Sequence, residues 1–183
     1  MATTAHLWAI AYDDMERAEQ VRDEITRLGW EDHYLLLQDV AVVVRHPDGS
    51  FTVDRERFPI TSNILGCTVA GFLAGLVVAA PLTGAAIGAA LGGAGTAAAV
   101  ASAGIANDFI LEVEGMMKPG TSALFVLDDE GDMEMILHAI CGLGGKVVKT
   151  NVDVERAKLI QSTLAGAVAD PANKAPVNME ASS

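Results

Sequence analysis

The architecture of this chain is decided by its middle, residues 58–107, which read FPITSNILGCTVAGFLAGLVVAAPLTGAAIGAALGGAGTAAAVASAGIAN. These fifty residues, rich in glycine and alanine, carry no charge and lie between Arg57 and Asp108. Pro81 falls near the middle and breaks a helix. Each half is roughly twenty residues long, the length of a membrane-spanning helix. The stretch therefore predicts an α-helical hairpin over 58–106 that turns at Pro81.

Glycine recurs at every fourth position in both arms of this hairpin. At that spacing the glycines fall on one side of a helix, and the missing side chains let another backbone approach closely. Broad van der Waals contact then replaces the interlocking of large side chains. We expect a helix-packing and oligomerisation surface formed by Gly71, Gly75, Gly84, Gly88 and Gly92.

The two arms differ in how well they suit lipid. Large apolar residues of the first arm favour insertion by roughly 2 to 5 kcal/mol, whereas those of the second contribute about 2 kcal/mol. The first arm could therefore span a bilayer, but the second needs protein neighbours. Two alternatives stay open: a hairpin that crosses or rests in the inner membrane, and a soluble hub in which hairpins from several subunits bundle.

The residues before the hairpin predict a strand, a helix and a pair of strands. Asp13 and Asp14 are suited to cap the helix, apolar residues recur along it at helical spacing, and Gly29 is expected to end it. A turn sequence, HPDGS, joins the second strand to the third. The predicted strands are residues 6–12, 34–45 and 51–53.

The residues after the hairpin predict helices alternating with strands. Asn107 or Asp108 is expected to cap a short apolar helix, which Lys118-Pro119-Gly120 ends. A helix from Asp132 is expected to stop at glycines 142–145. Strands are predicted at 122–127 and 146–152, and a last helix from Asp153 to about Ala167.

This order of elements predicts an α+β fold, a ferredoxin-like split-βαβ sandwich. Its two βαβ halves close into an antiparallel sheet with both helices on one face. The glycine- and alanine-rich hairpin is then an insert. We expect a discontinuous ferredoxin-like domain at 1–57 and 107–167, the hairpin at 58–106, and a flexible tail at 168–183, where apolar residues are few.

Composition excludes one class of partner and indicates a compartment. The formal net charge is −12 with twelve Lys and Arg, and the chain has no run of basic residues, so we expect no nucleic acid partner. The first residues lack the basic and apolar regions of a signal peptide. We therefore expect a cytoplasmic domain, with the hairpin as its route to the inner membrane.

Motifs for catalysis or metal binding are not recognisable in the sequence. The four histidines have no partner at zinc spacing, and neither a GxSxG elbow nor a phosphate-binding loop occurs. Residues 142–145 follow a helix and precede a strand, the reverse of a dinucleotide-binding turn. We expect no enzyme activity, no cofactor and no metal.

Two further groups of residues receive structural interpretations. Cys67 and Cys141 lie among small or apolar neighbours, so we expect two buried thiols, with a disulfide or a metal pair as alternatives. The acidic run 128–132 lacks calcium-loop spacing, and we interpret it as a solvated turn and helix cap.

Three segments carry a resemblance to a known family. They are DVAVVVRHPDG (39–49), AGIANDFILEVEGMMKPGTSALFVL (103–127) and GGKVVKTNVD (144–153), with the glycine-rich insert between the first two. In these the chain resembles a widespread bacterial group described only as predicted membrane proteins with a domain of unknown function. The resemblance implies fold and self-association but no reaction. Relatives usually carry bulkier aromatics in the insert than this chain does.

The combined expectation is a non-enzymatic homo-oligomer that associates through its glycine-bearing hairpin, with the lipid membrane as a second partner. A different class of function is the alternative. In it, the protein is a small-molecule-sensing oligomer that binds its ligand between ferredoxin-like domains, and the hairpin only assembles the subunits.

Overall fold

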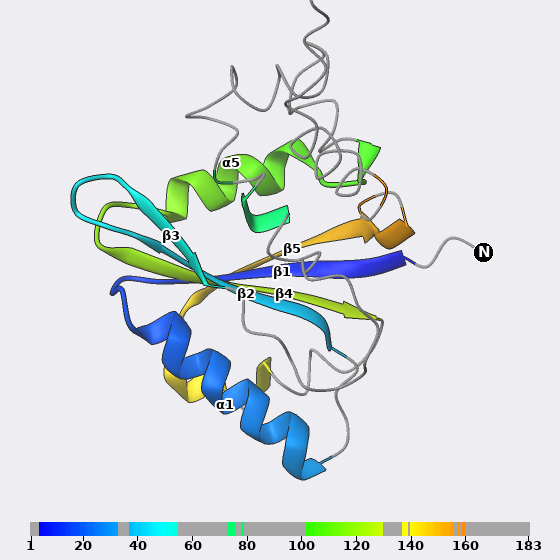
Figure 1. Cartoon of the computed structure of the whole chain (residues 1–183), viewed down its shortest axis with the longest axis horizontal. Helices are drawn as coiled ribbons and strands as arrows, with labels where there is room; N and C mark the ends of the chain where they lie inside the picture. The colour runs from blue at the N-terminus through cyan, green and yellow to red at the C-terminus, as the bar shows by residue number, and fades with distance from the viewer. Residues whose placement is uncertain are drawn as a thin grey trace, which may run out of the picture.

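The computed structural model describes residues 4–32, 37–54, 73–75, 78, 102–129, 137–138, 140–155, 157 and 159. In this part the chain has a mixed α/β fold, a five-stranded antiparallel sheet with a helix on each face (Figure 1). The elements are β1 (Thr4–Tyr12), α1 (Arg17–Asp32), β2 (Leu37–Arg45), β3 (Phe51–Asp54), α5 (Asn107–Met116), β4 (Thr121–Asp129), a 3-10 helix (Cys141–Leu143) and β5 (Lys146–Asp153).

The strands lie in the order β3-β2-β4-β1-β5, and every neighbouring pair is antiparallel. The first strand of the chain thus lies between the last two, with β4 on one side of it and β5 on the other. The predicted strands and the predicted pairing of β2 with β3 are confirmed. The strands are longer than expected where they extend into charged residues, such as β4 through Asp129.

Helix α1 covers one face of the sheet, as its apolar spacing predicts. Ala18, Val21 and Ile25 are fully buried in a cluster with alternate residues of β1, β2 and β4. Asp14 caps the helix, since its Oδ1 accepts hydrogen bonds from the backbone N–H groups of Glu16 and Arg17. That part of the prediction is confirmed.

The predicted end of α1 at Gly29 is wrong, because the helix continues to Asp32. A glycine inside a helix costs about 1 kcal/mol relative to alanine, which a helix packed on a sheet tolerates. The second helix expected on this face is partly described. Ile140 is buried in the α1 cluster, and Leu137 and Leu143 pack against it.

Helix α5 covers the opposite face of the sheet (Figure 1). The predicted ferredoxin-like sandwich has both helices on one face and leaves this face uncovered. Phe109, Ile110 and Val113 are buried there. β1 presents mostly small residues to this face, Ala5, Leu7, Ala9 and Ala11. Both faces of the sheet are therefore buried, which explains why the central strands are apolar at nearly every position.

The predicted cap of α5 at Asn107 or Asp108 is wrong. The N-cap is Ala106, which has no side-chain acceptor to offer. Its backbone N–H instead donates to Thr150 Oγ1 on β5 at 3.3 Å, and Lys146 forms an ion pair with Glu112 at 2.8 Å. Contacts with β5 position α5, so burial of its apolar face outweighs the missing cap.

Gly145 makes the turn into β5 possible. Its φ of 107° is in a region that L side chains rarely adopt, and an added Cβ would lie 2.7 Å from Cε1 of Tyr12. The predicted helix stop at 142–145 thus also brings the backbone close to the Tyr12 ring.

Most of the predicted hairpin, its turn at Pro81, and the tail at 168–183 lie outside the described residues.

Candidate functional site

Of the five glycines predicted to form the packing surface, the structure describes Gly75. The other predicted members and the hairpin turn lie outside the described residues: Gly71, Gly84, Gly88, Gly92 and Pro81. Residues 73–75 and 78 are helical, in agreement with the helical arm expected there.

This short helical segment has two different sides. Leu73 and Ala74 are fully buried, Val78 is nearly so, and all three belong to the core cluster on the α5 face of the sheet. Gly75 is partly exposed, and a Cβ added to it would meet no atom of the described residues within 4 Å. The segment therefore packs on the domain through Leu73, Ala74 and Val78, and among the described residues nothing fills the space at its glycine.

A search of the described residues for a helix both long and apolar enough to cross a membrane finds none.

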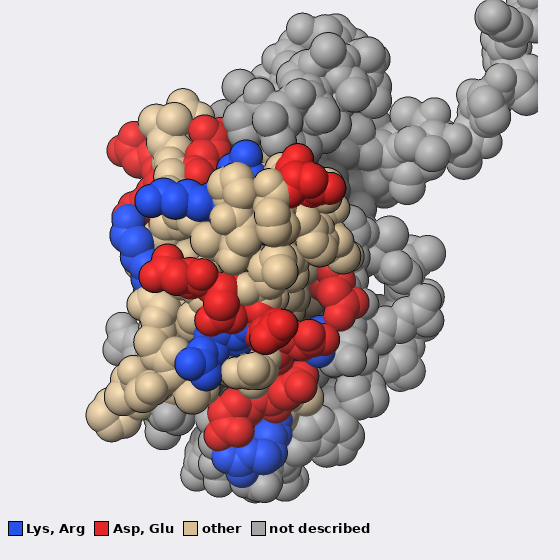
Figure 2. Space-filling model, turned by 90° about the vertical axis from the view of Figure 1, so that its left-hand side faces the viewer, with Lys and Arg blue, Asp and Glu red and all other residues tan. Residues whose placement is uncertain are grey.

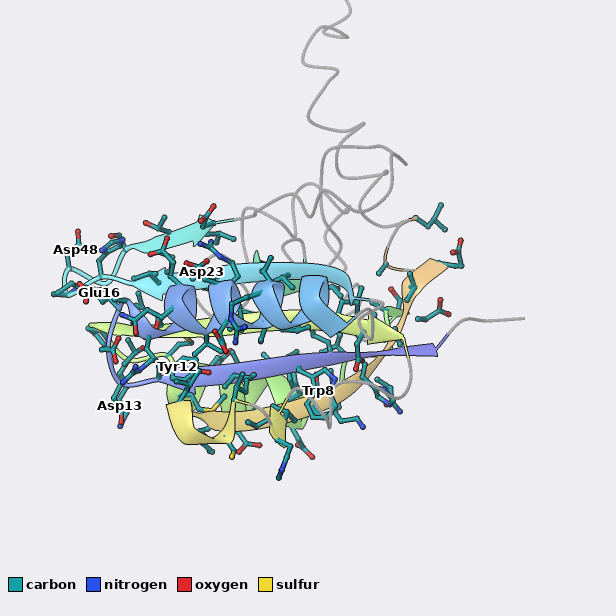
Figure 3. The ribbon with its side chains drawn as sticks, turned by 90° about the horizontal axis from the view of Figure 1, so that it is seen from below. Trp8, Tyr12, Asp13, Glu16, Asp23 and Asp48 are labelled. Carbon is teal, nitrogen blue, oxygen red and sulfur yellow. The ribbon has the colours of Figure 1, made fainter. Side chains whose placement is uncertain are left out.

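A second group of residues, on the other face of the sheet, was not expected from the sequence. We name it the Asp128 cluster, after the residue at its centre. In the sheet register His6 of β1 lies opposite Asp128 of β4, and Trp8 lies opposite Lys149 of β5. Residues directly opposite share a face, and Trp8 belongs to the α1 cluster. Figure 3 shows this face, with Trp8 and Tyr12 along β1. The Asp128 cluster consists of His6, Trp8, Asp128 and Lys149.

Asp128 is buried without full hydrogen bonding. Its side chain is 5% exposed, and His6 Nδ1 lies 3.8 Å from Oδ1, beyond hydrogen-bond distance. Among the described residues, neither Asp128 Oδ1 nor Trp8 Nε1 has a hydrogen-bond partner with good geometry. The ammonium of Lys149 lies 4.6 Å from the centroid of the Trp8 ring. An acceptor oxygen and an indole donor thus lie together without a hydrogen-bond partner among the described residues, beside the ammonium of Lys149.

The burial of Asp128 raises the pKa of its carboxyl group above the ordinary value, because the charged form loses hydration. The indole N–H of Trp8, then His6 and Lys149, lower the pKa in the opposite direction but do not cancel the effect of burial. The indole N–H is therefore close enough to act on the charge, although it does not meet hydrogen-bond geometry. Burial therefore favours the neutral form of Asp128 more than it is favoured in an exposed aspartate.

Interpretation of the acidic run 128–132 as a solvated turn is wrong for its first residue. Asp128 is part of β4 and buried, and Asp129 ends the strand, whereas 130–132 lie outside the described residues. Alternation along β4 puts Asp128 on the same face as Leu124 and Val126, but only its pairing with His6 and Leu37 extends the strand this far.

Tyr12 is another buried polar residue of this face. Its hydroxyl has no hydrogen-bond partner among the described residues. Burial raises the pKa of Tyr12 to about 12, and the positive charge of Arg17 opposes this only in part. The expected burial of Cys141 is wrong, since this free cysteine is exposed in the 3-10 helix, whereas Cys67 lies outside the described residues.

The surface at one end of the sheet is strongly charged. Figure 2 shows Asp and Glu side chains spread across it, with Lys and Arg between them. Arg22 of α1 is buried there and bonds Asp54 of β3 at 2.8 Å and Asp23 at 3.1 Å. Within the described part, no three His, Cys, Asp or Glu residues are grouped so as to hold a metal ion.

The described residues define a mixed α/β protein with a five-stranded antiparallel sheet. Residues 64–165, more than half of the chain, match a family model described as "Protein of unknown function (DUF1269)". The chain therefore belongs to this family, whose description assigns no activity. No curated protein and no solved structure matches the chain.

Proposed function

We propose that this protein is a non-enzymatic homo-oligomer whose subunits associate through the glycine-bearing side of the segment 58–106. The observation that carries the proposal is the asymmetry around Gly75. Leu73, Ala74 and Val78 are buried within the chain, while a Cβ added to Gly75 would meet no atom of the described residues within 4 Å. A helix anchored through its large residues presents its smooth side to another molecule.

The chemistry of the segment supports association with another helix. Gly71 lies one helical turn before Gly75, so the two fall on one side of a helix. Small residues at this spacing allow two backbones to approach closely. The segment carries no charge that would have to be buried in such a contact. A second copy of the same surface meets these requirements.

Within this proposal we favour a bundle of hairpins between subunits over a hairpin surrounded by lipid. Leu73 and Val78 are among the residues that would have to face lipid in a membrane-spanning arm, and both are buried against the domain. Association of the assembled hub with the inner membrane is the second form of the proposal, with the domain in the cytoplasm.

We further propose that the sheet is a ferredoxin-like split-βαβ core with one added edge strand. The strand order supports it, since β5-β1-β4-β2 places the fourth core strand beside the first and the third beside the second. In that scheme β3 is the added edge strand. Helix α5 and the segment around Gly75 occupy the face that such a core leaves open.

The test compares two glycines with the same local environment. Gly75 and Gly115 of α5 are both helical, and at each an added Cβ would meet no described atom within 4 Å. Replacement of either by leucine should stabilise the helix by up to about 1 kcal/mol. A loss of assembly therefore cannot be attributed to a weaker helix.

We expect the whole purified chain to have a molar mass by light scattering that is a multiple of 19.0 kDa. Gly75→Leu should lower this mass, whereas Gly115→Leu should leave it unchanged. Gly84→Leu with Gly88→Leu should have the same effect as Gly75→Leu while circular dichroism stays that of the wild type. A wild-type monomer, or equal masses for Gly75→Leu and the wild type, would overturn the proposal.

A further inference from the structure

The Asp128 cluster occupies a central place in the sheet. Asp128 is next to the last residue of β4, opposite His6 of β1 on one side and Leu37 of β2 on the other. Lys149 reaches the cluster from β5 through its contact with the Trp8 ring. Four strands therefore meet around one buried carboxyl group.

The neutral and the charged form of this carboxyl differ in the free-energy cost of their burial. A neutral carboxyl has lost its charge and tolerates burial, whereas a carboxylate requires hydrogen-bond donors or water. The ring nitrogen Nδ1 of His6 is 3.8 Å from Oδ1 of Asp128. A charge-assisted hydrogen bond needs about 2.8 Å, so the two side chains would have to approach by roughly 1 Å.

The charged and titratable groups around Asp128 come from two elements. Among the described side chains, β1 contributes His6 and β5 contributes Lys149. β2 contributes the backbone of Leu37. The helix residues packed in the α1 cluster are apolar: Ala18, Val21, Ile25, Leu137, Ile140 and Leu143. The buried Arg22 of α1 forms ion pairs with Glu19, Asp23 and Asp54.

We propose that Asp128 is the proton-binding group of a pH-sensitive switch at this end of the sheet. With its proton, the carboxyl stays buried between β1 and β4. When it releases the proton to solvent, the carboxylate moves toward His6 and Lys149, and the ends of β1 and β4 loosen to allow this. The switch lies on the α1 face, while Gly75 belongs to the α5 face, so it does not depend on the proposed assembly.

The direction of the pH dependence follows from linkage. Folding raises the pKa of Asp128, so its carboxylate binds a proton more tightly in the folded state than in the unfolded state. The resulting stability is fully present below the ordinary aspartate pKa and is lost as pH rises through the raised value. The closed state of the switch is therefore the state at low pH.

A titration of the wild-type chain tests the proton site directly. Side-chain carboxyl ¹³C shifts are followed by NMR from about pH 3 to about pH 8, a range that spans the ordinary carboxyl values. Asp128 should titrate above an ordinary aspartate. Asp48 is the internal control, because hydrogen bonds from the hydroxyl and backbone of Ser50 lower its pKa. A midpoint for Asp128 at or below the ordinary value overturns the proposal.

A second measurement tests the structural response. The chain has two tryptophans, so Trp30→Phe leaves Trp8 as the sole indole reporter. Its emission should change at the pH at which Asp128 titrates. Above that pH the amides of Leu7 and Leu127 should lose protection against exchange, measured relative to the intrinsic exchange rate at each pH. Asp128→Asn should abolish both changes, and Asp13→Asn, at an exposed residue, should leave both.

His6→Gln separates the switch from a simple titration of histidine. Because the positive charge of His6 lowers the Asp128 pKa, its removal should move the midpoint to higher pH. If instead the Trp8 transition disappears in His6→Gln and persists in Asp128→Asn, histidine is the titrating group and the proposal is wrong.

Discussion

Leu73→Ala tests whether the start of the glycine-rich segment is part of the folded domain. Leu73 is 0% exposed and is among the largest fully buried side chains of the chain. It packs in the cluster that contains Phe109 of α5 and Phe125 of β4. Truncation of a fully buried leucine costs the transfer free energy of the lost atoms and leaves a cavity, in total about 2 to 5 kcal/mol.

The matched control is Leu111→Ala. Leu111 is 65% exposed on α5, so the same chemical change should alter the free energy of unfolding by no more than about 0.5 kcal/mol. For a chain of this size, a loss of about 3 kcal/mol corresponds to a fall in melting temperature of about 6 to 12 °C.

The assay is thermal and denaturant unfolding of both variants and the wild type at several protein concentrations. Concentration series are needed because assembly of the folded state raises apparent stability. At each concentration Leu73→Ala should melt well below Leu111→Ala. Equal melting temperatures for the two variants would show that Leu73 does not contribute to the domain core, and the two-sided description of this segment would fail.

Three smaller predictions follow from single contacts. Gly145→Ala should cost about 2 to 4 kcal/mol in unfolding experiments, because it combines a strained φ with a clash against Tyr12, while Gly142→Ala, in open space among the described residues, should be nearly neutral. Ser122→Ala should cost about 1 to 2 kcal/mol in chemical denaturation, since Ser122 Oγ accepts from Ala18 N and donates to the Asp14 carbonyl. In a Tyr34→Phe background, ultraviolet absorbance should show Tyr12 ionising near pH 12. Neutral Tyr12 contributes to the free energy of unfolding, and this contribution should be lost between about pH 10 and pH 12, as the pH rises through the folded pKa.

Local pattern predicted the elements of the sheet well. Alternating or continuous apolar runs gave all five strands, and helical spacing gave the buried positions of α1 and α5. The errors lie at element ends. Gly29 did not stop α1, and Ala106 caps α5 without a side chain, because tertiary packing outweighs local preferences of about 1 kcal/mol.

Placement of α5 and of Asp128 could not be derived from local pattern. The partners of α5 are strands distant in the chain, so nothing within 107–116 indicates which face it covers. Asp128 was assigned to a turn together with the rest of the acidic run 128–132, yet pairing with His6 and Leu37 extends β4 through it. Both are consequences of non-local pairing. The packing role of Gly71, Gly84, Gly88 and Gly92 stays a prediction.

Because β1 lies between β4 and β5, both of its neighbours in the sheet are synthesised late. On the ribosome the first strand emerges long before its two neighbours, Thr121–Asp129 and Lys146–Asp153. The charge-free stretch is synthesised in the interval, ahead of the twelve buried residues from Ala103 to Ala157 that cluster with Leu73 and Val78. Contacts so distant in sequence form slowly, and exposed apolar segments aggregate in the meantime. Until translation reaches the last strand, Leu73 and Val78 therefore lack part of the cluster that buries them in the folded chain.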